Sequence, residues 1–340
     1  MATIHHNINQ LQLGEKKAGV YLVKNHAVKQ TNKGNPYLDI VLVDKTGEIS
    51  GKWWNIQGFN CDTIVDSDFI VVKYLVEDYN GNKQLRIENL KLVDPTTDFD
   101  PADIIPVSPE DPKLLYQEIY NVASSFNNNE LKKLTLNILD ERKDALLKMP
   151  AAKSVHHAVV GGLLLHTAGM LRSAKALSSV YKSFNEELLY CGVILHDICK
   201  LDEFFAGPLG IVTDYTSCGK LLGHLHMGAA YIENKCKELD ISNETSLVLA
   251  HMILSHHGEP EFGSAVRPMF VEASLLHMLD LIDSRVYMFN DVTKDMEDNT
   301  FSQKIFMLDN VQVYKHNINK KGNDTVDFYD LPEEPTEDMF

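Results

Sequence analysis

Histidines are concentrated in the middle of this 340-residue sequence, where ten of the fourteen lie between His156 and His277. Most of them stand beside apolar residues in segments of helical periodicity, where a solvated histidine has no reason to be. Any one of them alone is most simply explained as a packed core residue. As a set they are interleaved with Asp197, Asp280 and Asp283. Because imidazole and carboxylate groups together bind cations such as Mn²⁺, Fe²⁺ or Mg²⁺, the set favours metal-dependent chemistry.

The His196-Asp197 pair is the centre of this pattern. It follows the apolar stretch 188–195, so an imidazole and a carboxylate emerge together near the end of a predicted helix, with Lys200 one turn later. A carboxylate can bridge two metal ions through its two oxygens. A single His-Asp pair arises by chance in many chains, so its meaning depends on its partners. The candidate partners, in chain order, are His166, His224, His256, His257 and Asp280.

The elements that must position these residues fall into two regions, of which the first is β-like. From residue 15 to residue 93 the apolar runs are short and alternate with turn clusters such as 31–35 and 80–82, which predicts five strands. A helical or irregular segment between residues 54 and 69 separates the third predicted strand from the fourth. This number and order of strands suit an OB-fold. We therefore expect residues 1–94 to form an N-terminal all-β OB-fold barrel that binds nucleic acid.

The rest of the chain has a different character. Residues 95–112, rich in proline and acidic residues, are predicted to be a linker. From residue 113 onward the apolar residues recur with the helical period, which predicts helices at 114–126, 130–147, 155–177, 186–200, 220–239, 244–255 and 270–290. Residues 113–318 are thus expected to form an all-α domain that carries the histidines. Residues 319–340 are acidic and rich in turn formers, and are predicted to be disordered.

Composition limits the compartment and the partners. The five cysteines are odd in number and far apart, which predicts reduced thiols in the cytoplasm rather than disulfides or a zinc ribbon. No signal peptide is recognised, and the longest stretch without Asp, Glu, Lys or Arg, residues 154–171, contains three histidines, so no membrane-embedded segment is expected. The formal net charge of −16 argues against a protein that coats DNA nonspecifically. Local basic strips can still bind a strand.

The ordered series of histidines and aspartates resembles the signature of the HD phosphohydrolase superfamily. The resemblance narrows to the YhaM-type 3′–5′ exoribonucleases, and it spans both predicted domains. The segments that carry it are 42–49 (LVDKTGEI), 150–153 (PAAK), 156–158 (HHA), 192–197 (GVILHD), 221–224 (LLGH), 254–258 (LSHHG) and 304–310 (KIFMLDN).

The resemblance implies a domain of the HD type with two divalent metal ions. It implies that one ion is held by His166, His196, Asp197 and Asp280. It implies that the second is held by His224, His256 and His257, with Asp197 as the bridge. Mn²⁺ is the favoured metal, and Fe²⁺, Co²⁺ and Mg²⁺ are alternatives. Asp197 and Lys200 are the candidate catalytic residues; Lys200 would neutralise phosphate charge, although a solvated cation near a helix C-terminus explains it equally well.

Neighbouring residues are assigned to supporting roles or left out. Adjacent helical residues point about 100° apart, so at most one of His156 and His157 can face the site, and both are left out of the ligand set. His251 and His277 either orient ligand imidazoles or are simply packed. Asp283 lies one turn beyond Asp280, and we expect it to hold a ligand histidine rather than a metal ion.

Aromatic and basic residues in the barrel region predict a surface for a single strand. The predicted residues are Lys33, Tyr37, Lys52, Trp53, Trp54 and Arg86. Rings of this kind stack on bases, and cations contact phosphates. Side chains alternate along a strand, so Trp53 and Trp54 point to opposite faces and one of them belongs to the core. A barrel used only for subunit contact is the alternative interpretation.

The leading hypothesis is a metal-dependent 3′–5′ exonuclease that hydrolyses single-stranded RNA, with DNA left open as a substrate and the barrel holding the strand. The first alternative is a nucleotide or cyclic-nucleotide phosphohydrolase, although the Gly-Tyr-Pro motif associated with cyclic-di-GMP hydrolysis is missing after residue 258. The second is a nucleic-acid-binding regulator with a structural metal site. Assembly into a homo-oligomer is left open.

Overall fold

The computed structural model describes residues 5–318 apart from Gln57, Ser67, 94–96, 98, 100, 153–158 and 207–209. The chain divides into two compact units, residues 1–284 and residues 285–340, and each is considered by itself. The predictions for His156, His157 and the 319–340 tail, and part of that for the 95–112 linker, fall outside the described residues.

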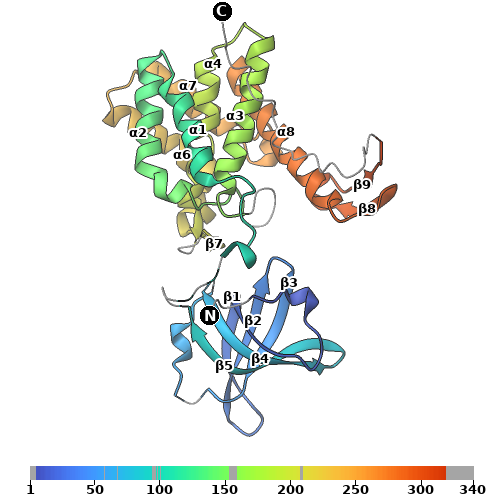
Figure 1. Cartoon of the computed structure of the whole chain (residues 1–340). Helices are drawn as coiled ribbons and strands as arrows, with labels where there is room; N and C mark the ends of the chain where they lie inside the picture. The colour runs from blue at the N-terminus through green and yellow to red at the C-terminus, as the bar shows by residue number, and fades with distance from the viewer. Residues whose placement is uncertain are drawn as a thin grey trace, which may run out of the picture. The chain divides into compact units, whose positions relative to one another are not determined.

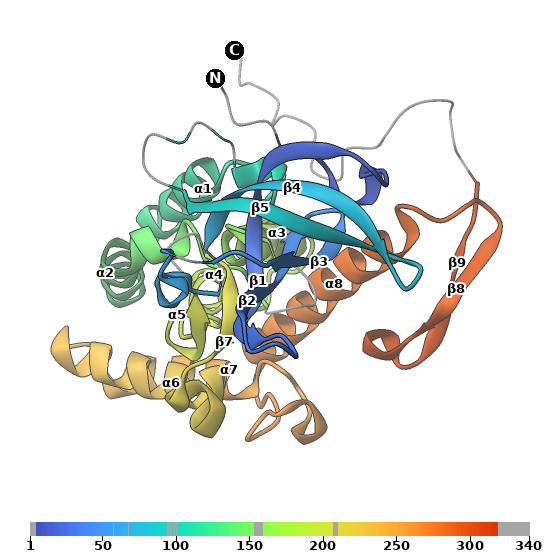
Figure 2. The same cartoon turned by 90° about the horizontal axis from the view of Figure 1, so that it is seen from below.

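Five strands near the N-terminus close into a barrel (Figure 1; seen from below in Figure 2). They are β1 (Lys16–Gln30), β2 (Pro36–Asp44), β3 (Gly47–Trp53), β4 (Phe69–Tyr79) and β5 (Asn82–Leu92). Their order around the barrel is β1-β2-β3-β5-β4, and β4 pairs with β1 to complete it. All pairs are antiparallel except β3 with β5. A five-stranded Greek-key barrel of this kind is an OB-fold, so the predicted fold of this region is confirmed.

Alternation along the strands builds the core of the barrel. Tyr21 of β1 and Tyr74 of β4 are fully buried, and their hydroxyl oxygens lie 2.7 Å apart. Trp53, at the end of β3, is only 7% exposed and belongs to the same core cluster. Trp54 is 47% exposed. The structure thus decides between the two tryptophans, and Trp53 is not available to stack on a base.

A buried ion pair ties the segment before β1 to the barrel. The ring nitrogens of His5 lie 2.9 Å from the carbonyl oxygen of Val20 and 3.0 Å from Oδ2 of Asp44. Both partners are acceptors, so both nitrogens must donate and the ring is an imidazolium. Burial alone would lower the pKa of His5, but the hydrogen bonds to Asp44 and Val20 raise it. Burial alone would raise the pKa of Asp44, but bonds from His5, Thr46 and the Ile8 amide lower it.

We expect this pair to make the stability of the barrel depend on pH. A pKa raised by folding stabilises the fold below the unfolded value of about 6.5 for His5, and the contribution is lost as the pH rises through the folded pKa. The lowered pKa of Asp44 acts with the opposite sign, and its contribution is lost only as the pH falls below about 3.8. The urea midpoint of the wild type should therefore exceed that of His5→Gln most near pH 6, and the difference should shrink toward pH 9.

Tryptophan fluorescence measures this effect selectively, because the only two tryptophans in the sequence are Trp53 and Trp54. The control is His316→Gln, which replaces an exposed histidine outside the barrel. A midpoint difference for His5→Gln that stays constant between pH 6 and pH 9 would show that the ring is not charged in the folded state.

The region after the barrel is helical, as predicted (Figure 1). Its helices are α1 (Pro112–Ser124), α2 (Asn129–Leu146), α3 (Gly162–Val180), α4 (Glu186–Leu195), α5 (Lys200–Glu203), α6 (Ser217–Glu238), α7 (Asn243–Ser255) and α8 (Val271–Thr293). Polar side chains cap their starts: Asn128 accepts hydrogen bonds from the first turn of α2, Asn185 from that of α4 and Thr216 from that of α6. The last turns of α8 belong to the second unit.

Several boundaries differ from the sequence prediction. Residues 155–158 of the helix expected at 155–177 lie outside the described residues, and α3 begins at Gly162, after Gly161 with a left-handed φ of 75°. The helix expected at 186–200 ends at Leu195, and α5 begins a separate turn. Two hairpins were not anticipated within the expected all-α region: β6 (Phe204–Ala206) with β7 (Val212–Tyr215), and β8 (Thr300–Ile305) with β9 (Val311–Lys315). These strands are too short to leave a clear alternating pattern.

The predicted linker is partly packed rather than fully extended. Within it, the short 3₁₀ turn Pro101–Asp103 is followed by Ile104 and Ile105, which are both buried. The two isoleucines cluster with Leu22 and Phe69 of the barrel strands. The described part of this segment therefore contributes apolar burial to the first unit.

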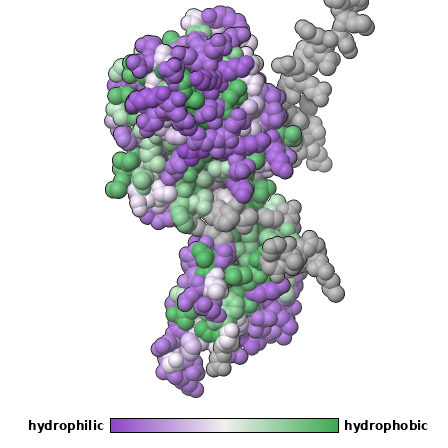
Figure 3. All heavy atoms as spheres, turned by 90° about the vertical axis from the view of Figure 1, so that its left-hand side faces the viewer, coloured by the Kyte–Doolittle hydropathy of each residue, from purple (hydrophilic) through white to green (hydrophobic). Residues whose placement is uncertain are grey.

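Hydrophilic residues cover most of the face of the helical region that Figure 3 shows. Some large apolar side chains nevertheless stay exposed in this region, among them Leu221, Phe262 and Met269. Across the part of the chain that the structure describes, no helix has both the length and the apolar character needed to cross a bilayer.

Candidate metal centre

The predicted ligands come from five helices that pack around one point. His166 lies on α3, His196 and Asp197 directly follow α4, His224 lies on α6, His256 and His257 follow α7, and Asp280 lies on α8. α3 packs on α4, α4 packs on α7, and α7 packs on α6. The two views agree that α6 and α7 lie side by side (Figure 1, Figure 2). Residues separated by more than a hundred positions thereby meet in one buried cluster.

Two of the histidines are oriented by the ends of their own helices. His196 closes α4, and its Nδ1 lies 2.8 Å from the carbonyl oxygen of Val193. His256 closes α7 in the same way, with Nδ1 2.7 Å from the carbonyl oxygen of Ile253. Because Nδ1 must donate to a carbonyl in both cases, Nε2 of each ring carries the free lone pair. This geometry explains why the predicted helix 186–200 stops early.

His166 is held by two aspartates of α8. Its Nδ1 lies 2.7 Å from Oδ2 of Asp283, and its Nε2 lies 3.3 Å from Oδ1 of Asp280. Asp283 therefore takes the orienting role that we expected for it. Burial alone would lower the pKa of His166, but the hydrogen bonds to Asp280 and Asp283 raise it to about 10. The same negative field that holds a proton on this ring attracts a divalent cation.

His224 is held by Glu203, a residue that the sequence analysis did not identify. Its Nδ1 lies 3.1 Å and 3.2 Å from the two carboxylate oxygens of Glu203, and its backbone amide lies 3.1 Å from one of them. Gly223 breaks the helical geometry of α6 immediately before it, with φ 68° and ψ 160°. The Glu203 side chain is only 9% exposed. A buried carboxylate that accepts from Nδ1 directs Nε2 of His224 toward the centre.

Asp197 stands between two groups of histidines. Its Oδ2 lies 3.2 Å from Nε2 of His196 and 4.0 Å from Nε2 of His166. Its Oδ1 lies 3.3 Å from Nε2 of His224 and 3.7 Å from Nε2 of His256. The ligand atoms of His166, His196 and Asp197 all lie within 4.8 Å of one another, and so do those of His224, His256 and His257. The two oxygens of one carboxylate thus face two candidate metal positions.

Lys200 is a buried partner of Asp197. Its Nζ lies 2.7 Å from Oδ2 of Asp197, and the residue is only 8% exposed. The interpretation of Lys200 as a solvated cation near a helix C-terminus is therefore wrong, because burial removes its water and the residue begins α5. Burial alone would raise the pKa of Asp197, but the positive charge of Lys200 beside it holds the pKa well below its usual range. Asp197 is accordingly a carboxylate at neutral pH.

Three buried polar atoms at this centre receive no hydrogen bond from any residue within the described ranges: Oδ1 of Asp197, Nε2 of His224 and Nε2 of His256. Each such atom costs about 1–3 kcal/mol when it stays unsatisfied. Burial and neighbouring histidines lower the pKa of His256 and of His257, so both rings are neutral, as metal ligation requires. Neutral imidazoles and a carboxylate converging on one space are the donor set that divalent transition metals accept. The residues present fit a metal centre.

The centre reaches solvent beside His257. Its own ring is partly exposed, whereas His256 is completely buried. Nδ1 of His257 lies 2.9 Å from the carbonyl oxygen of Phe262 in the next turn. His277 contacts the backbone of the neighbouring ligand, because its Nδ1 lies 2.9 Å from the carbonyl oxygen of His256. His251 contacts a different segment, where its Nε2 accepts a hydrogen bond from the amide of Met269 at 3.1 Å.

Two glycines leave room for the two acidic residues that hold the histidines, one for a carboxylate and one for a backbone carbonyl. A Cβ on Gly169 of α3 would lie 2.4 Å from Oδ1 of Asp283, and a Cβ on Gly219 of α6 would lie 2.3 Å from the backbone oxygen of Glu203. Real Cβ atoms do not approach oxygen so closely. Close approach rather than backbone conformation therefore requires glycine at both positions.

The predicted strand-binding surface is largely assembled on the outside of the barrel. The rings of Tyr37 and Trp54 lie 4.6 Å apart between centroids. Nζ of Lys52 lies 5.7 Å from each of these centroids and 5.2 Å from that of Tyr79. Arg86 pairs with Lys52 in register across β5 and β3, but its guanidinium contacts Glu77 at 2.7 Å.

The two remaining residues predicted for this surface lie apart from the cluster. Lys33 is exposed in the turn between β1 and β2. Trp53 points into the core, as described above. Tyr79 also belongs to the cluster of Tyr37, Lys52 and Trp54. It stands at the end of β4, where that strand pairs with β5.

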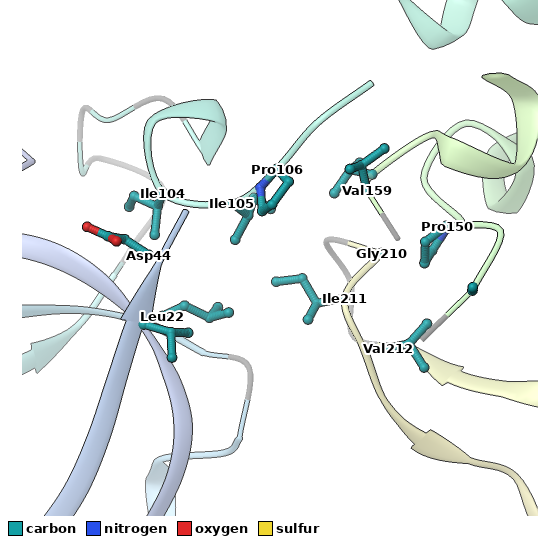
Figure 4. A pocket seen from close by; sticks show the side chains of 13 residues that line it. Leu22, Asp44, Ile104, Ile105, Pro106, Pro150, Val159, Gly210, Ile211 and Val212 are labelled. Carbon is teal, nitrogen blue, oxygen red and sulfur yellow. The ribbon is translucent and has the colours of Figure 1, made fainter. Parts of the chain in front are cut away.

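A cavity elsewhere in the first unit is unrelated to this centre (Figure 4). It has a volume of about 140 Å³ and is lined mainly by apolar residues such as Ile104, Ile105 and Ile211. Asp44 is its one acidic lining residue, and the hydrogen bonds to His5, Ile8 and Thr46 already engage that carboxylate. None of the predicted metal ligands lines it.

Comparisons with known proteins agree with this geometry. Residues 163–285, which contain every predicted metal ligand, match the family model of the HD domain. A protein of Shouchella clausii named 3′–5′ exoribonuclease YhaM is 34% identical over 317 residues, which cover 92% of this chain and 98% of that protein. Proteins with the same name from Oceanobacillus iheyensis and Listeria innocua are each 33% identical, and the match covers 96% of each.

Solved structures that resemble this chain include the following two, each of which covers about a quarter of it. A replication protein A domain from Methanococcus maripaludis is 20% identical and covers 26% of this chain and 96% of its own, with a TM-score of 0.23. Pot1pC of Schizosaccharomyces pombe bound to ssDNA is 13% identical and covers 27% of this chain and 88% of its own, with a TM-score of 0.21. These scores are low, so the OB-fold assignment rests on the strand order.

Proposed function

Because the chain belongs to the family of the YhaM 3′–5′ exoribonucleases, we propose that it shortens single-stranded RNA from the 3′ end by hydrolysis at the histidine-aspartate centre. The observation that carries the proposal is the position of Asp197, whose two oxygens face two histidine groups. Such an arrangement suits hydrolysis of a phosphodiester bond. Relatives that match barrel and helical region together favour a strand over a small nucleotide as substrate.

Two divalent cations complete the proposed site, with Mn²⁺ favoured and Fe²⁺, Co²⁺ or Mg²⁺ as alternatives. The first set of ligands is His166, His196, Asp197 and Asp280, and the second is His224, His256, His257 and the shared Asp197. The chemistry that bound cations supply in such a site is polarisation of the phosphate and a lowered pKa of the attacking water. Lys200 keeps Asp197 ionised and in place, while Glu203 and Asp283 fix the rings of His224 and His166.

The depth of the centre supports attack at a chain end. The side chains of His166 and His196 are 0% exposed and that of Asp197 is 4% exposed, whereas that of Asp280 is 18% exposed. A terminal nucleotide can be inserted into such a site, whereas the middle of a strand would have to bend sharply to reach it. We therefore favour an exonuclease over an enzyme that cuts internally.

We assign the strand-holding role to the cluster of Tyr37, Lys52, Trp54 and Tyr79 on the barrel, with Lys33 and Arg86 as phosphate contacts. Exposed rings stack on bases without regard to sequence, and a lysine among them attracts the phosphate backbone. Trp54 and Tyr79 are 47% and 55% exposed, so their faces can be covered by bases. Trp53 is not assigned to this surface, because its ring lies in the core of the barrel.

Trp54→Ala should raise KM for a long single-stranded RNA about fivefold and leave kcat nearly unchanged. The estimate takes stacking on an exposed ring as about 1 kcal/mol per base. Tyr181→Ala, which removes an exposed ring outside the barrel, is the matched control. Steady-state rates on a long RNA and on a dinucleotide would measure the effect. An equal loss on both lengths would rule out a strand-holding role for Trp54.

A comparison of substrate classes tests the proposed activity. The purified chain with Mn²⁺ is incubated with a single-stranded RNA, a mononucleotide and a cyclic dinucleotide, and products are resolved over time. We expect mononucleotides to accumulate from the RNA while the two small substrates stay intact. Hydrolysis of a small substrate with an intact strand would instead establish the nucleotide phosphohydrolase. Strand binding without hydrolysis of any substrate would establish the regulator.

Three finer assignments remain predictions. The five cysteines are free, and four of them are buried, which supports the cytoplasm as the proposed location. The preference for RNA over DNA follows from the names of the relatives. Assembly into a homo-oligomer is measured by sedimentation of the purified chain.

A further inference from the structure

The turn that follows the last predicted histidine ligand carries an exposed phenyl ring. Pro260–Phe262 form a short 3₁₀ turn between Gly258 and Gly263, which have left-handed φ values of 81° and 99°. The amide of Phe262 lies 3.0 Å from the carbonyl oxygen of Glu259, so the turn is closed by its own backbone. The carbonyl oxygen of Phe262 in turn accepts from Nδ1 of His257 at 2.9 Å. Phe262 is therefore held next to the metal centre.

Neither folding nor ligand orientation explains the side chain of Phe262. The bond to His257 uses the backbone carbonyl, which any residue provides. The residue itself is 65% exposed, so its ring contributes little apolar burial. A small or polar residue would serve the turn equally well. The described fold leaves the ring free to contact a ligand.

The position of Phe262 indicates what covers its ring. The centre is buried around His256 and is partly exposed at Asp280 and at His257, the residue that Phe262 contacts. A nucleotide whose phosphate lies at the centre can place its base toward solvent on the side of His257. An exposed aromatic ring offers such a base a stacking surface, and stacking accepts all four bases because each has a π-face.

We propose that Phe262 stacks on the 3′-terminal base of the RNA while the scissile phosphate lies at the metal centre. This proposal rests on the proposed function and adds to it a substrate contact that is independent of base identity. It predicts an enzyme that degrades all sequences but discriminates against a 3′ nucleotide without a base.

The test uses two 5′-labelled RNAs that are identical except that one carries an abasic ribose at its 3′ end. The wild type should cleave the abasic RNA with a kcat/KM about tenfold lower, mainly through KM, because one stacking contact is lost. Phe262→Ala should lose about tenfold on the normal RNA and little on the abasic RNA, so the discrimination disappears. Phe262→Leu should behave like Phe262→Ala, and Phe262→Tyr should restore the discrimination.

A spectroscopic signal separates stacking from support of the turn. RNA with 2-aminopurine as its 3′ base should lose fluorescence on mixing with the wild type, before hydrolysis begins, and lose much less with Phe262→Leu. The control variant Phe306→Ala removes another ring, 79% exposed on the second unit, and should leave both measurements unchanged. Equal losses on normal and abasic RNA, or unchanged quenching in Phe262→Leu, would overturn the proposal while the exonuclease activity stands. If the wild type shortens neither RNA, the proposed function itself fails, and this inference fails with it.

Discussion

Asp197→Asn should reduce kcat on single-stranded RNA by at least about 10³-fold. The substitution keeps the size of the side chain but removes the charge that faces both histidine groups. Loss of this charge should forfeit about 4 kcal/mol of transition-state stabilisation, and each 1.36 kcal/mol is a factor of ten in rate. Single-turnover rates with saturating enzyme and Mn²⁺ measure the loss without interference from binding.

The matched control is Asp291→Asn, which neutralises an exposed aspartate of α8 that pairs with Lys294. It should retain the wild-type rate. The fold of Asp197→Asn is checked by its thermal unfolding in the absence of metal. A folded Asp197→Asn variant that keeps more than about a tenth of the wild-type rate would contradict a site in which Asp197 serves two metal ions.

Glu203→Ala should lower the metal affinity of the second histidine group and the rate at limiting metal by about 10–100-fold. Residues that orient a metal-bound histidine have effects of this size. Without the carboxylate, Nδ1 of His224 loses its acceptor and the ring is no longer held toward Asp197. Glu203→Gln should lie between the wild type and Glu203→Ala, because its amide oxygen still accepts one hydrogen bond. Calorimetric titration with Mn²⁺ measures the affinity directly.

Glu238→Gln is the matched control for Glu203→Gln. It makes the same change from carboxylate to amide in an exposed side chain near the end of α6, the helix that carries His224. It should leave the titration unchanged. If Glu203→Ala slows catalysis but binds Mn²⁺ as the wild type does, Glu203 acts on the reaction by some route other than the orientation of His224.

The sequence was sufficient for the parts of this account that depend on periodicity and on residue type. Strand alternation and turn residues predicted the barrel, and the apolar period predicted the helices. The histidines and aspartates stood out as candidate ligands because they lie in apolar helical segments, and the resemblance to the HD superfamily implied how they divide into two ligand sets. The spacing of His166, His196 and His224 then placed one histidine on each of several consecutive predicted helices, which helix packing brings together.

Other features depend on contacts between residues that are distant in the sequence, and no local pattern predicts them. Glu203 looks like any acidic residue at a helix end until α6 packs against it. Trp53 and Trp54 differ only through the register of β3 against its neighbours, which decides which ring faces the core. The early end of α4 arises because the ring of His196 bonds to the backbone, an alternative to continuing the helix.

The proposed role of Phe262 could not be predicted from the sequence for a related reason. Its role follows from the contact of its carbonyl oxygen with His257 and from its 65% exposure, and neither can be read from the residue type. A signal was nevertheless present in the sequence, because the turn directly after the histidine pair holds a large aromatic residue between two glycines, where small polar residues would be expected.

The most direct test of the central claim compares a linear RNA with a circular RNA of the same sequence, in the presence of Mn²⁺. We predict that the linear RNA, labelled at its 5′ end, shortens through a descending ladder, that a 3′ label is released at once as a mononucleotide, and that the circle stays intact. Cleavage of the circle, or a ladder that starts from the 5′ end, would contradict an exonuclease that begins at the 3′ end.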